Sequence, residues 1–137
     1  MKTETIKNAK KVLEVFPTLK DLMLHDTMKK VLPPMVIMAF SNSQQWEGVS
    51  MAVNNMVNQM NGNPLYGNYC FIGNNEKGEV DMYDHSGDTI IIDSLTVFKA
   101  ILVIIYCSYM SIELNDKQHN AYVDFYGQDT DVYRILN

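Results

Sequence analysis

The sequence contains few of the residues from which catalytic and metal-binding sites are usually built. It has two cysteines, three histidines and one tryptophan in 137 residues. Cys70 and Cys107 lack the paired spacing of a metal site and have apolar neighbours, so we expect buried free thiols in a reducing compartment. The histidines are scattered, and no nucleophile, base and orienting acid can be assigned. We therefore expect a protein that is not an enzyme and has no catalytic residue, metal or cofactor.

Phosphate-binding and calcium-binding loops are also absent. Glycines 62, 67, 73, 78 and 87 stand at the spacing of turns, and no G-x-G-x-x-G or P-loop pattern occurs. Asp81, Asp84, His85 and Asp88 lie within eight residues of one another, but not at the alternate spacing of a calcium loop. We interpret them as a solvated turn between strands.

The sequence has no long hydrophobic run. Its first residues lack the apolar core of a signal peptide. Ile101 to Cys107 is strongly apolar, but Lys99 and Ser108 bound it well short of the roughly 18–20 residues that cross a membrane. We expect a cytoplasmic protein without a membrane span.

Charge is distributed unevenly along the chain. The net charge is −5, made up of +3 over residues 1–34 and −8 over residues 35–137. An acidic body repels phosphate, which argues against strong binding to nucleic acid. We interpret the lysines of the first segment as a solvated helix face.

A length of 137 residues predicts a single domain over residues 1–137. Apolar periodicity predicts that it begins with helices. A helix is expected over residues 3–16 with Thr3 as N-cap, and a short one over 18–25. The run 35–40 is a strand candidate, although a helical turn there stays open. An amphipathic helix is expected over residues 43–60, with an apolar stripe that runs from Trp46 to Met60.

The second half of the chain predicts a sheet followed by a buried helix. Strands are expected over 66–74, 79–83 and 89–92, joined by tight turns into an antiparallel meander. Asp93 or Ser94 would cap the next helix, which is apolar on nearly all sides and must be covered by more than one layer. Two short helices with Gly127 between them complete the chain. The predicted class is therefore α+β: a meander sheet of three to four strands packed against a central apolar helix, with helices at the N-terminus and C-terminus.

The order of these motifs resembles the antirestriction proteins of the ArdB/KlcA type over most of the chain. The matching residues are Leu32-Pro33, then Tyr66, Gly67, Tyr69 and Phe71, then Asn74 or Asn75 with Gly78, Met82-Tyr83, Ser94 and Val132-Tyr133-Arg134-Ile135. The tryptophan expected in the first strand is absent, with Tyr69 or Cys70 in its place, and NNEKGE replaces the family's NGG turn.

The resemblance implies a protein of mobile genetic elements that relieves type I restriction-modification without being a nuclease. Its partner would be a protein, such as a component of the type I system. The candidate interaction surface comprises Asp81, Tyr83, Asp84 and Asp88. Two other readings remain: a small acidic chaperone that binds its client through the Trp46–Met60 stripe, and an immunity-type protein that covers a toxin with the acidic stretch 79–93. Monomer and dimer both stay open.

Overall fold

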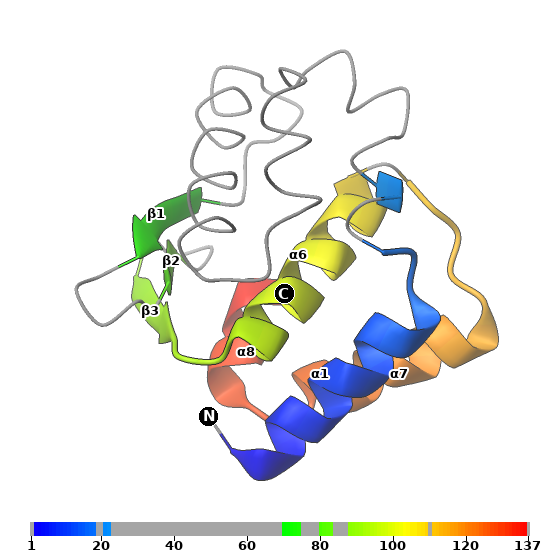
Figure 1. Ribbon diagram of the computed structural model, residues 1–137, viewed down its shortest axis with the longest axis horizontal. Helices are drawn as coiled ribbons and strands as arrows, with labels where there is room; N and C mark the ends of the chain where they lie inside the picture. The colour runs from blue at the N-terminus through cyan, green and yellow to red at the C-terminus, as the bar shows by residue number, and fades with distance from the viewer. Residues whose placement is uncertain are drawn as a thin grey trace.

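The computed structural model describes residues 2–18, 21–22, 70–74, 80–83, 88–109 and 111–136. Figure 1 shows the elements in these ranges. They are, in chain order, α1 (Thr3–Val15), β1 (Cys70–Asn74), β2 (Val80–Tyr83), β3 (Thr89–Ile92), α6 (Leu95–Tyr109), α7 (Asp116–Tyr126) and α8 (Thr130–Leu136). The predicted strand 35–40, the predicted helix 43–60 and most of the predicted helix 18–25 lie outside the described residues.

Helix α1 (Thr3–Val15) nearly matches the predicted range 3–16, but its N-cap differs from the prediction. Its N-cap is Lys2, which makes no side-chain capping bond, so the assignment of Thr3 as N-cap is wrong. The buried face contains Thr5, Asn8, Ala9 and Val12. The lysines at 7, 10 and 11 are exposed, as the predicted solvated face requires.

The three strands form one antiparallel sheet in the order β1-β2-β3. The pairing of β1 with β2 contains an irregularity between Phe71 and Gly73, whereas β2 and β3 pair regularly. On β3, Ile90 and Ile92 are buried, and Thr89 and Ile91 are exposed. Strand β3 therefore turns one face to the core and the other face to solvent.

Helix α6 lies at the centre of the described core. The residues from Val97 to Cys107 that are at most 8% exposed are Val97, Phe98, Ala100, Ile101, Leu102, Val103, Ile104, Ile105 and Cys107. Of the two predicted caps, Ser94 is the one observed, because its hydroxyl accepts from the Val97 N–H at 3.3 Å. The central position predicted from the apolar pattern is therefore observed.

The end of α6 is a Schellman-type turn. The Ile112 N–H donates to the Cys107 carbonyl at 2.9 Å, and the Ser111 N–H donates to the Ser108 carbonyl at 3.1 Å. Ser111 occupies the left-handed position of this motif with a φ of 54°, where glycine is the usual residue. The turn directs the chain from α6 towards α7.

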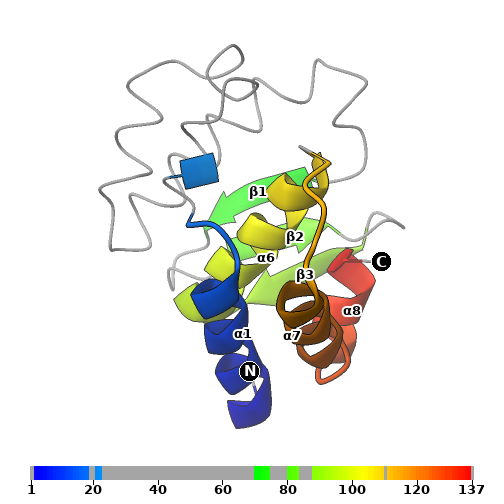
Figure 2. The same cartoon turned by 90° about the vertical axis from the view of Figure 1, so that its right-hand side faces the viewer.

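Figures 1 and 2 show the sheet on one side of α6 and helices α1 and α7 on the other. Helix α1 packs against both α6 and α7, and α8 contacts α6 and α7. The Asn8 side-chain amide donates to the Asp124 carbonyl of α7 at 3.4 Å, which joins the first helix to a late one. Helices distant in the sequence therefore pack against the central helix.

The predicted fold class needs correction. The described part of the chain is mostly helical, with helices of 7 to 15 residues against strands of 4 or 5. Helix α6 packs mainly against α1 and touches only β3 of the sheet appreciably, so the α+β arrangement built on a meander sheet is wrong. A four-residue strand spans about 13 Å, whereas a fifteen-residue helix spans about 22 Å. Strands this short leave the cover of α6 to other helices.

Candidate functional site

Three of the four residues predicted as an interaction surface lie on β2 or directly before β3. Asp81 lies opposite Ile91 in the register, and Tyr83 lies opposite Thr89. Asp88 directly precedes β3 and is exposed. Asp84 lies outside the described residues. Since opposite residues of an antiparallel pair belong to the same face, we call Asp81, Tyr83, Thr89 and Ile91 the β2–β3 face.

Ile91 is the unusual residue of this face. Its side chain is 52% exposed, whereas its neighbours Ile90 and Ile92 are at most 3% exposed. Three consecutive isoleucines suggest burial when read as a run, but strand alternation forces the middle one to the opposite face. The exposed isoleucine was not singled out from the sequence, although the predicted period of two contains the signal.

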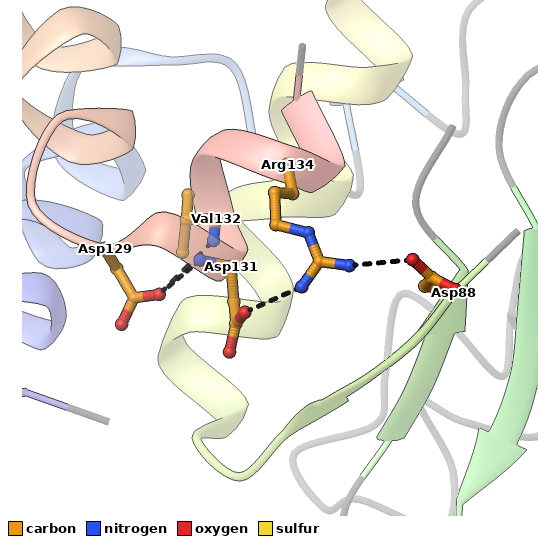
Figure 3. A network of polar contacts seen from close by, with 5 residues as sticks. All are labelled: Asp88, Asp129, Asp131, Val132 and Arg134. Atoms are coloured by element: carbon orange, nitrogen blue, oxygen red, sulfur yellow. Dashed lines mark hydrogen bonds and ion pairs between the residues drawn. The ribbon is translucent and has the colours of Figure 1, made fainter. Parts of the chain in front are cut away.

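Asp88 is held by the last helix. Figure 3 shows the Arg134 guanidinium between two carboxylates, 3.5 Å from Asp88 and 3.4 Å from Asp131. The Asp129 carboxylate accepts from the Asp131 N–H at 2.9 Å and so caps the start of α8. Arg134 therefore links α8 to the start of β3 and offsets part of the negative charge beside the β2–β3 face.

The ion pair between Arg134 and Asp88 holds the two side chains near each other but contributes little to the stability of the fold. The Asp88 side chain is 73% exposed and that of Arg134 is 38% exposed, so water screens their attraction. Such pairs typically contribute about 0–1 kcal/mol. Arg134 belongs to the closing motif of the sequence, but no local pattern pairs it with a residue 46 positions earlier.

The described residues include one free thiol and no cluster of metal-ligating side chains. No group of three or more His, Cys, Asp and Glu side chains gathers among them to hold a metal ion. Cys107 is a free, buried thiol, and desolvation by burial raises its pKa to about 11. It is therefore protonated near neutral pH, which makes it a poor nucleophile.

None of the helices within the described ranges is long and apolar enough to cross a membrane. Fifteen-residue α6, the most apolar of them, is instead buried among other elements of the chain.

Comparison with protein-family models, with curated proteins and with solved structures found no significant match. A functional proposal must therefore start from the geometry of the β2–β3 face and from the order of sequence motifs.

Proposed function

We propose that the protein acts without catalysis, by binding another protein through the β2–β3 face. The observation that carries this proposal is the 52% exposure of Ile91, opposite Asp81 in the sheet. A protein-binding patch usually combines an apolar core with a polar rim, and the register places the polar residue Asp81 opposite the exposed Ile91. On the opposite face of β3, Ile90 and Ile92 are buried in the core, so packing fixes the position of the strand that carries Ile91.

We further propose that the partner belongs to a type I restriction-modification system and that binding relieves restriction. The support is the resemblance in motif order, together with the proximity of two of its motifs in space. Arg134 of the closing motif pairs with Asp88, five residues after Tyr83 of the hairpin motif. Residues far apart in the sequence thus gather beside one face, as the parts of a shared binding surface would.

Phage plating tests this proposal. Unmodified phage would be plated on a host with an active type I system, with and without expression of the protein, and on a host with a type II system. We expect plating to recover by at least tenfold on the first host only. Unchanged plating with a folded, abundant protein would refute the antirestriction function.

A matched pair of variants tests the surface. Ile91→Asp places a charge on the β2–β3 face, whereas Val123→Asp makes the same kind of change at an apolar side chain of α7 that is 37% exposed. We expect Ile91→Asp to abolish the recovery of plating and Val123→Asp to retain it, with both proteins folded. Full activity of Ile91→Asp would place the contact on another surface.

A further inference from the structure

A cavity of about 400 Å³ lies away from the β2–β3 face, at the far end of α6. Its walls come from the ends of several elements: α1, α6, the segment that follows α6, α7 and α8. The lining residues are Phe16, Ile104, Cys107, Ser108, Ser111, Ile112, Leu114, Tyr122 and Leu136. Its volume falls within the range of small-molecule sites, roughly 300–1,000 Å³.

Burial divides the cavity into an apolar floor and a polar mouth. Phe16, Ile104, Cys107 and Leu136 are each at most 8% exposed and form the floor. Ile112, Leu114 and Tyr122 are half-buried, whereas Ser108 and Ser111 are exposed. A molecule that enters would therefore bury an apolar body and keep hydrogen-bonding groups at the serine end.

The walls of the cavity are held by ordered local structure. Cys107, Ser108, Ser111 and Ile112 belong to the Schellman-type turn, whose two backbone bonds measure 2.9 and 3.1 Å. The Tyr122 ring packs on Tyr126 with 4.8 Å between ring centroids. A wall shaped before binding reduces the entropy that a ligand must lose.

Charge restricts the kind of ligand. The described lining residues include no Asp, Glu, Lys, Arg or His, and the Cys107 thiol is protonated near neutral pH. An ion placed here would lose hydration without gaining a counter-charge from these residues. Among the described residues, the lining therefore matches a neutral ligand.

We propose that this cavity binds a small neutral molecule with an apolar ring or chain and one hydroxyl, amine or carbonyl group that faces Ser108 and Ser111. This site is separate from the proposed protein-binding face and does not depend on it. Either proposal can hold without the other.

The test uses N-phenyl-1-naphthylamine, a neutral probe whose emission increases in apolar surroundings. The full chain should bind it saturably with one equivalent. Ile112→Trp, which fills the half-buried wall, should weaken binding at least tenfold, whereas Val123→Trp on the outer side of α7 should stay within twofold of the unsubstituted chain. Equal binding by both variants, or no saturable binding, would overturn the proposal.

Two further measurements keep the test decisive if Ile112→Trp does not fold. In the unsubstituted chain, saturating probe should slow alkylation of Cys107 by N-ethylmaleimide at least fivefold, measured by mass spectrometry of the Cys107 peptide. An unchanged alkylation rate would place the probe elsewhere. The anionic relative 1-anilinonaphthalene-8-sulfonate should bind at least tenfold more weakly, and equal binding would refute the preference for neutral ligands.

Discussion

The side-chain amide of Gln118 donates a hydrogen bond to the backbone carbonyl of Val15, 2.9 Å away, and so joins the start of α7 to the end of α1. The amide oxygen of the same residue accepts from the Asn115 N–H at 3.0 Å, and the Gln118 N–H donates to the Asn115 side chain at 2.9 Å. One side chain therefore completes a capping box and also satisfies a carbonyl that helix α1 leaves unpaired at its end.

Gln118→Glu separates these two roles. A glutamate retains the acceptor that the capping box needs but has no N–H to donate to Val15, and it places a carboxylate near that carbonyl. We expect the free energy of unfolding to fall by about 1–2 kcal/mol in urea titrations. Asn115→Ala, which removes the cap and leaves the Val15 bond, should also cost about 1 kcal/mol. A change below about 0.3 kcal/mol in Gln118→Glu would mean that the bond to Val15 is not stabilising.

Thr5 is fully buried in α1, and its hydroxyl has no hydrogen-bond partner among the described residues. Valine has nearly the same shape and lacks the hydroxyl, so Thr5→Val removes the cost of burying an unsatisfied polar group. We expect a gain of about 1 kcal/mol in the free energy of unfolding. Thr3→Val, on the exposed side of the same helix, is the matched control and should give no gain. A loss of stability in Thr5→Val would indicate that the hydroxyl is satisfied in solution.

Ser111 adopts a left-handed backbone conformation with a φ of 54°. This conformation costs a residue with a Cβ roughly 1–2 kcal/mol. Glycine avoids that cost but loses more conformational entropy on folding, so the net gain from a glycine is smaller. We expect Ser111→Gly to raise the free energy of unfolding by about 0.5–1 kcal/mol, measured by urea denaturation. Ser108→Gly, inside α6, should instead lower it by a similar amount. Destabilisation by Ser111→Gly would contradict the observed turn.

The buried thiol of Cys107 makes stability dependent on alkaline pH. Burial raises its pKa from 9.0 to about 11 in the folded protein. The unfolded chain therefore loses the thiol proton at a lower pH than the folded protein, which favours unfolding as the pH rises. The contribution of the protonated thiol to folding stability is fully present below pH 9 and is lost as the pH rises towards 11. Between pH 8 and pH 10 the unsubstituted chain should lose about 1 kcal/mol more than Cys107→Ala. Parallel pH profiles of the two proteins would show that the thiol is not buried in solution.

Local patterns predicted individual elements well. The apolar positions of residues 95–109 indicated a helix buried on nearly all sides, and Ser94 was one of the two caps expected. The strand over 89–92 and the break at Gly127 also lie where the turn residues indicated. These features depend on neighbours within one or two turns of the chain, so the sequence contains the relevant signal.

The candidate site was predicted less completely. Asp81, Tyr83 and Asp88 were chosen as residues near a hairpin, and the register places the first two opposite Ile91 and Thr89. The exposure of Ile91 depends on which face of the sheet the core covers, and the partner of Asp88 lies 46 residues away. Both require the packed structure.

By itself, the sequence determined where the chain forms the described helices and strands and which side chains of α6 must avoid water, because periodicity, caps and turn residues act locally. Only the tertiary structure decided that α1 packs against α6 more extensively than the described sheet does, that Gln118 reaches Val15, and that the ends of several elements surround a cavity. Those outcomes depend on contacts between residues far apart in the sequence, such as Gln118 and Val15, which are 103 positions apart. A local pattern shows which side chains need cover, but not which distant segment provides it.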